Sequence, residues 1–301
     1  MKKIDILNTS FRLNLPQKAQ NAFDSNNEEF LPTDSIDLSP KKVVNIGSDR
    51  AIKEPKFSSN RAMLPYIKGY EEKIGWDAIF AVSKLLEVNL NKAGIFSMHA
   101  AALQYKGRGA LLLGDSGAGK TTTAINAAIK NKDVELIGGS RIIIQDGMIL
   151  GSAGKIRVRK GSIISEFGRQ ELVSGKRFEK MNLDEMVAFT PKEFGLGDPI
   201  VQKIKIKELI FVKKIPVDTV HVWNLDKEDI FLRLYDALSF YSERLPAVIL
   251  YKKTPYPDLF GDHLRKKRIE CALKLSKISS VYIEGDPKQL VDQTLKRLIY
   301  Y

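Results

Sequence analysis

The chain has 301 residues, of which 44% are hydrophobic and 28% charged, with a formal net charge of +12. This composition is typical of a globular protein that fills its own core, and it argues against disorder or a fibrous repeat. The apolar runs are far shorter than the roughly 20 residues that cross a bilayer, and a single cysteine excludes an internal disulfide and a multi-thiolate metal site.

The first 72 residues predict a small β-rich or irregular N-terminal region. They are rich in Asn, Ser, Asp, Pro and Lys, with short alternating stretches such as residues 42–46. The first six residues lack the apolar core of a signal peptide, so we expect a cytoplasmic location and no membrane partner.

A helix should lead from this region into the main domain, residues 73–301. Apolar residues recur at helical spacing up to the plausible helix end at residues 91–94; they are Trp76, Ile79, Phe80, Val82, Leu85 and Leu86.

Residues 95–105 read as a strand, 106–109 as a hairpin turn and 110–113 as a buried strand that ends at a glycine-rich loop. The short turn predicts antiparallel pairing, which would bring His99 beside the loop. A helix over 121–130 follows. Strand, glycine loop and helix in this order is the context that a phosphate-binding loop requires.

Beyond the loop the pattern is mixed. Short strands are expected over 135–137, 141–144, 148–150, 155–158 and 208–212, and helices over 227–241 and 287–298. Cys271 falls in a helical stretch and is interpreted as a buried structural thiol.

The loop reads Gly-Asp-Ser-Gly-Ala-Gly-Lys-Thr, a Walker A motif. In such a loop consecutive backbone N–H groups converge on phosphate oxygens, Lys120 neutralises the β and γ phosphates, and the Thr121 hydroxyl ligates Mg²⁺. The motif therefore predicts binding of ATP or GTP with Mg²⁺. The expected phosphate-binding residues are Gly114, Asp115, Ser116, Gly117, Ala118, Gly119, Lys120, Thr121 and Thr122.

Residues 97–123, with a histidine on the strand before the loop, a short turn and a Gly-Asp-Ser-Gly-type Walker A, resemble the catalytic domain of HPr kinase/phosphorylase. They are also similar to the nucleotide-binding part of ATP-dependent phosphoenolpyruvate carboxykinase, which shares that core. The resemblance is clear over residues 95–160. It implies an α/β fold in which a mixed sheet carries helices, and it implies that His99 lies beside the γ phosphate.

The sequence departs from both families after the next strand. Gly139 and Ser140 stand where paired aspartates would hold magnesium and take a proton from the attacking hydroxyl. The strand over 208–212 ends in two lysines and offers no Walker B aspartate. The remaining acidic candidates are Asp115, Asp146, Glu166 and Asp198, of which Asp146 and Asp198 are better explained as turn residues.

Two functions of different classes follow. The first is a kinase that transfers the γ phosphate to a hydroxyl of a protein, peptide or small molecule, with Lys120 and His99 as catalytic residues. The second is a non-catalytic ATP- or GTP-binding module, which the missing aspartates favour. Arg141, Arg157 and Arg159 are candidates for contact with phosphate or an acidic substrate, and surface placement is the alternative for each.

The net charge suggests a third, weaker reading, a kinase or ATPase linked to nucleic acid. Its densest basic segment is residues 263–268. The expected partners are thus a nucleoside triphosphate and a phosphate acceptor, with nucleic acid a minor alternative and a homo-oligomer left open.

Overall fold

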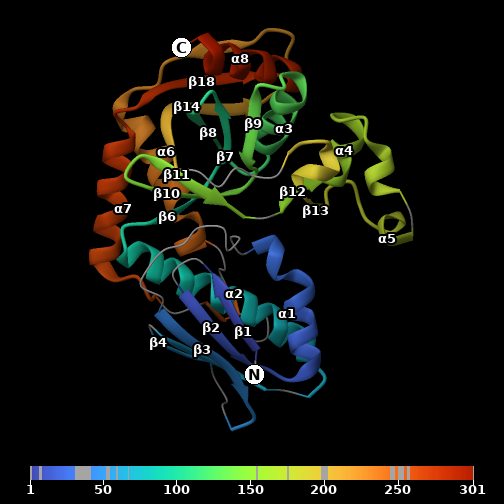
Figure 1. The fold of residues 1–301 in the computed structure, drawn as a ribbon, viewed down its shortest axis with the longest axis vertical. Coiled ribbons are helices and arrows are strands. Elements are labelled where there is room, and N and C mark those ends of the chain that lie inside the picture. The colour runs from blue at the N-terminus through green and yellow to red at the C-terminus, as the bar shows by residue number, and fades with distance from the viewer. Residues whose placement is uncertain are drawn as a thin grey trace.

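The computed structural model describes residues 2–6, 9–30, 42–51, 55–58, 60–66, 68–153, 155–174, 176–197, 203–244, 248–249, 254–255 and 258–300. These residues form a mixed α/β structure with two principal sheets, as the sequence predicted for the fold class. In Figure 1 the smaller sheet lies below and the larger one above, with a projecting flap at one side.

The N-terminal residues form a five-stranded sheet in the order β1-β2-β3-β5-β4. Alternate residues such as Phe11, Val44 and Leu64 face a core shared with Phe23 of the covering helix α1. The elements are β1 (Lys2–Ile6), β2 (Thr9–Asn14), α1 (Gln17–Phe30), β3 (Lys42–Asp49), β4 (Lys56–Ser58) and β5 (Arg61–Pro65).

Helix α2 (Glu71–Lys92) connects the two sheets. It is buried along most of its length, and its apolar residues share one core with the N-terminal sheet and with Ile143 and Leu150 of the larger sheet. It ends before Gly94, whose φ of 73° permits the left-handed turn. A helix that is apolar on several sides is expected when layers pack against it from more than one direction.

The larger sheet has nine strands and is mixed. Its main path is β6-β10-β11-β14-β8-β7-β9, and β18 joins at β14. Strand β14 runs parallel to both β8 and β18, whereas the other pairs are antiparallel. The strands are β6 (Phe96–His99), β7 (Ala101–Tyr105), β8 (Arg108–Leu113), β9 (Val134–Gly138), β10 (Arg141–Gln145), β11 (Met148–Ser152), β14 (Ile204–Lys214), β15 (His221–Trp223) and β18 (Ser279–Gly285).

Helices cover both faces of this sheet. Leu112 and Ile210 pack with α3 (Lys120–Lys130) and α8 (Pro287–Tyr300), whereas Leu111 and Phe211 pack with α6 (Lys227–Ser239) and α7 (Gly261–Leu275). Because successive residues of a strand point to opposite faces, strands buried on both sides read as continuous apolar runs. Cys271 is buried on α7, as expected.

The single strand expected over 95–105 is divided at Ala100. The first part, β6, pairs with β10, and only the second part, β7, folds back along β8 through the tight turn. The reason given for His99 lying beside the loop was therefore wrong, because His99 ends the first part and pairs in register with Arg141.

Residues 156–197, which we call the flap, leave the sheet after β11 and return before β14 (Figure 1). Phe189 and Phe194 anchor the flap in the core beside α3. The flap contains β12 (Ile156–Arg159), α4 (Lys160–Ser165), the 3₁₀ turn η1 (Gln170–Val173), α5 (Lys176–Glu179), β13 (Met186–Phe189) and the 3₁₀ turn η2 (Pro191–Phe194).

A π-helical turn η3 (Phe240–Arg244) continues α6, and β16 (Val248–Ile249) pairs with β17 (Thr254–Pro255). No helix in the described ranges is long and apolar enough to cross a membrane.

Candidate functional site

The glycine-rich loop lies between the end of β8 and the start of α3, as the motif requires. Gly114 has φ of 144°, and a Cβ there would lie 2.5 Å from the Val212 carbonyl oxygen of the neighbouring strand. Only glycine permits this close approach. At the other end of the loop the Lys214 N–H donates to the Ala118 carbonyl at 3.0 Å, so β14 holds the loop in place.

Lys120 is folded back over its own loop. Its ammonium donates to the carbonyl oxygens of Gly114 at 2.8 Å and Asp115 at 2.9 Å, and the residue is only 5% exposed. Burial lowers the pKa of Lys120 to about 8, and the charge of Asp115 opposes this shift. A phosphate would offer Lys120 a stronger, charge-assisted partner than the two carbonyls.

The loop opens into a cavity of about 390 Å³. Of the residues predicted to bind phosphate, Ser116, Gly117, Gly119, Lys120, Thr121 and Thr122 line it; Gly114, Asp115 and Ala118 do not, and they contribute the carbonyls described above. The remaining described lining residues come from β6, the 140–141 segment, the flap, the end of β14 and η3; they are His99, Ser140, Arg141, Arg157, Val158, Arg159, Ser162, Glu166, Asp184, Met186, Lys214, Phe240 and Tyr241.

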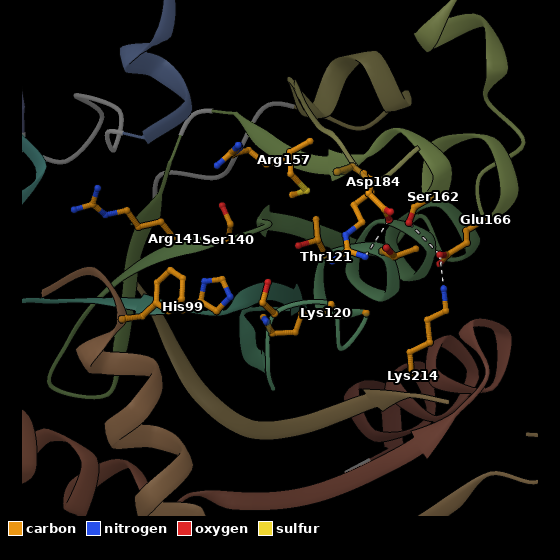
Figure 2. Close-up of a pocket in the computed structure, with 18 of the residues that line it drawn as sticks. His99, Lys120, Thr121, Ser140, Arg141, Arg157, Ser162, Glu166, Asp184 and Lys214 are labelled. Atoms are coloured by element: carbon orange, nitrogen blue, oxygen red, sulfur yellow. Dashed lines mark hydrogen bonds and ion pairs between the residues drawn. The ribbon is translucent and has the colours of Figure 1, made fainter. Parts of the chain in front are cut away.

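His99 lines one end of this cavity, on the same side of Lys120 as Ser140 (Figure 2). Its ring stacks on Phe240 with the centroids 4.0 Å apart. The next residue, Tyr241, donates its hydroxyl to the Ser140 carbonyl at 2.8 Å, and burial raises the pKa of this phenol, which keeps it protonated. Both aromatic residues lie in the π-helical turn η3, a local geometry that is frequent at functional sites.

The Gly139–Ser140 segment lies next to Thr121. The Thr121 hydroxyl donates to the Gly139 carbonyl. A Cβ on Gly139 would lie 2.4 Å from Ile156 Cγ2 and 2.9 Å from Thr121 Cγ2, so this position admits only glycine. Ser140 lines the cavity and has room for a side chain. The segment therefore offers the cavity one side chain, the Ser140 hydroxyl, and no carboxylate.

Arg141 has a structural environment that the sequence analysis did not anticipate. It is 1% exposed and pairs with Glu87 of α2, while its other guanidinium N–H groups donate to Ser97 at 3.1 Å and Ser83 at 3.2 Å. Surface placement, one of the two expectations for Arg141, is therefore wrong. Contact with phosphate stays a prediction, because Arg141 also lines the cavity.

Arg159 comes from β12 of the flap and extends over the phosphate loop. One of its terminal nitrogens lies 3.5 Å from the position of a Cβ on Gly117, and its ion partner is the exposed Asp184 at 3.7 Å. Arg157 also lines the cavity, from the same strand. Backbone N–H groups, Lys120 and these arginines together make the loop region suitable for a polyanion.

At the opposite end of the cavity from His99, Glu166 of the flap meets Lys214 at the end of β14 (Figure 2). The Lys214 ammonium donates to Glu166 Oε1 at 2.7 Å, and the Ser162 hydroxyl donates to the same oxygen at 3.1 Å. The pair ties the flap to the central sheet.

Of the other acidic candidates, Asp115 is part of the loop but does not line the cavity. Asp146 forms a turn with φ of 49° and pairs with Lys274, so its interpretation as a turn residue is confirmed. Asp198 lies outside the described residues. In the described part of the chain no cluster of three or more acidic, His or Cys side chains could hold a metal. The oxygens beside Thr121 suit Mg²⁺ carried by a nucleotide, because Mg²⁺ takes few protein ligands and completes its shell with phosphate oxygens and water.

Several lining residues were missed by sequence reasoning, namely Ser162, Asp184, Lys214, Phe240 and Tyr241. A signal existed for Lys214, since it ends a strand that runs parallel to β8, and the ends of parallel strands meet at one edge of a sheet. The others come from the flap and from η3, whose positions depend on tertiary packing.

Comparison with models of known protein families gave no match for this chain, and comparison with curated proteins gave none either.

Proposed function

We propose that this chain binds a magnesium nucleoside triphosphate at the 114–121 loop and transfers the γ phosphate to a hydroxyl of an acceptor at the His99 end of the cavity. The observation that carries the proposal is the convergence in one cavity of the phosphate loop, Lys120, Arg159 and His99. The loop and its cations suit the triphosphate. His99 and Ser140 line the end of the cavity beyond them, and we assign the acceptor to that end.

The orientation of the nucleotide follows from Thr121. Its hydroxyl faces the Gly139 carbonyl, so a metal bound to it would lie near Ser140. Mg²⁺ held there would neutralise charge on the β and γ phosphates. The γ phosphate is therefore assigned to the Ser140 and His99 end, and the nucleoside to the Glu166 and Lys214 end.

In the proposed reaction the acceptor oxygen forms a bond to the γ phosphorus as the bond to the bridging β–γ oxygen breaks. The nucleoside diphosphate leaves, and the hydroxyl proton passes to a base. Lys120 and Arg159 are placed to stabilise charge on the phosphoryl oxygens. His99 lies at the acceptor end and is proposed to take or position the proton.

A non-catalytic nucleotide-binding module is the second candidate. It is favoured by the Gly139–Ser140 segment, which supplies no carboxylate beside Thr121. A bound triphosphate would then persist, and its effect would be a change in the flap that a partner detects. Measured turnover separates the two candidates.

The nucleic-acid alternative gains little from α7. Arg265 pairs with Asp258 at 2.7 Å, Lys267 donates to the Lys92 carbonyl at 2.7 Å, and Arg268 is buried against Glu243 and Asn91. These cations have partners within the fold, so the segment is not a free basic surface. Salt-dependent RNA or DNA binding is the measurement that would revive this alternative.

The proposal is tested by Lys120→Ala, with Lys130→Ala as the matched control at the far end of the same helix. Lys120→Ala should abolish detectable ATP and GTP binding while circular dichroism and thermal unfolding show an intact fold. Lys130, which is exposed and pairs with Asp292, should be replaceable without loss of affinity. Unchanged nucleotide affinity in folded Lys120→Ala would refute the proposed site.

A further inference from the structure

Glu166 is held in the cavity wall with one oxygen satisfied and the other not. Its side chain is 10% exposed, and Oε1 accepts from Lys214 and Ser162. Oε2 is buried, and among the described residues no donor reaches it. A buried carboxylate oxygen without a donor is costly, so such an atom indicates that a ligand supplies the hydrogen bond.

The missing partner must be a donor, because an ionised carboxylate only accepts. The phosphates of a bound nucleotide cannot fill this role. Four kinds of ligand group can donate: an acceptor hydroxyl, a metal-bound water, a ribose hydroxyl and an N–H of the nucleobase. Of the last two, the ribose is joined directly to the phosphates and so lies closer to the loop. The first two belong near the γ phosphate, at the Ser140 and His99 end, whereas Figure 2 shows Glu166 and Lys214 at the other end, with Lys120 and Thr121 between.

We infer that Glu166 Oε2 accepts a hydrogen bond from a ribose hydroxyl of the bound nucleotide, and that it selects ribonucleotides over deoxyribonucleotides. The inference rests on the proposed function, which assigns the nucleoside to this end. Carboxylates read ribose hydroxyls in the same way in dinucleotide-binding folds.

Lys214 offsets the repulsion between the Glu166 carboxylate and the phosphates of a nearby nucleotide. Its ammonium lies on Glu166 Oε1, so the pair carries no net charge toward the α phosphate. The same contact and the Ser162 hydroxyl fix the carboxylate, which leaves Oε2 directed to the remaining donor. Lys214 is in turn fixed at its backbone by the bond to Ala118 in the loop. Phosphate and ribose recognition are thus connected through one residue.

The test compares affinities of the wild-type protein for inorganic triphosphate, for the better bound of ATP and GTP, and for the 2′-deoxy and 3′-deoxy forms of that nucleotide. Loss of a hydrogen bond to a charged acceptor should weaken at least one deoxy form by about tenfold or more. Glu166→Gln should reduce this discrimination, and Glu166→Ala should bring it to about unity. The affinity of Glu166→Ala for inorganic triphosphate should not fall.

Glu171→Ala is the matched control, because Glu171 lies on the same flap, pairs with Arg169 and is exposed outside the cavity. It should keep the wild-type discrimination. The inference is overturned if the wild-type protein binds ribo- and deoxyribonucleotides equally, or if discrimination persists in folded Glu166→Ala. Failure of inorganic triphosphate and of every nucleotide to bind would instead overturn the proposed function, so the two failures are distinguishable.

Discussion

At the residue scale, burial changes the pKa of Lys120 in a way that an anionic ligand would reverse. In the free protein its ammonium has carbonyl partners, and its pKa is lowered to about 8. A triphosphate bound as proposed would place negative charge beside it and raise that pKa. Binding and protonation of this lysine are therefore coupled.

The coupling predicts how affinity depends on pH. Below about pH 8 Lys120 is protonated with or without ligand, so this residue makes affinity independent of pH. Above that value the free protein loses the proton before the complex does, and affinity should fall by up to about tenfold per pH unit. Titrating the dissociation constant for ATP between about pH 7.5 and 9.5 measures this. Lys120→Arg, which stays charged, should give a flat profile if it binds, and a flat wild-type profile would contradict the prediction.

Replacing His99 should affect phosphoryl transfer and nucleotide affinity differently. If it serves the acceptor, His99→Ala should reduce phosphoryl transfer on the order of 100-fold, with little change in nucleotide affinity. Single-turnover transfer and equilibrium binding measure the two effects. His263→Ala, an exposed histidine on α7, is the control. Loss of folding in His99→Ala would show instead that stacking on Phe240 is its main role.

Gly139 and Ser140 are predicted to respond differently to the same substitution. Gly139→Asp places a Cβ against Ile156 and Thr121 and should destabilise the fold by about 1–3 kcal/mol or more. Ser140→Asp adds a carboxylate to the cavity and should raise any slow triphosphate turnover. Thermal unfolding and phosphate release measure these outcomes. Flat turnover in Ser140→Asp that still binds nucleotide would mean that this side chain does not reach the reacting phosphate.

At the scale of elements, β10 and α2 are joined by the buried pair of Arg141 and Glu87. Strand β10 pairs with β6, which carries His99. The contact holds β10 against α2, and α2 also packs against the N-terminal sheet. A buried pair costs desolvation on both sides, so its intact form contributes little stability, but the loss of one partner leaves a buried charge.

Glu87→Ala should therefore lower the free energy of unfolding by about 3–5 kcal/mol. Combining Glu87→Met with Arg141→Met should recover much of that loss, because no buried charge remains. Denaturant unfolding of the three proteins measures the effect. Glu171→Ala, which breaks an exposed pair, should change little. Equal destabilisation by the single and double variants would contradict this account.

At the scale of the molecule, the cavity is assembled from segments far apart in the chain. The loop and α3 come from residues 114–130, the flap from 156–197 and the aromatic turn from 240–244. Helix α2 ties this assembly to the N-terminal sheet through one continuous core. The flap lines this cavity and connects back to the sheet through the contact of Glu166 with Lys214.

The sequence by itself determined the features that depend on local order. The strand, glycine loop and helix of residues 110–130 follow from spacing, and so do α2, β14, α6 and α8. Local sterics and hydrophobic periodicity suffice for these, because both act over a few residues. The division of the first strand at Ala100, the burial of Arg141 and the meeting of Glu166 with Lys214 were decided only by the tertiary structure. Those features depend on contacts between residues 42 to 58 positions apart, such as His99 with Arg141 and Ser83 with Arg141. Such contacts depend on how whole layers pack and not on the neighbouring residues.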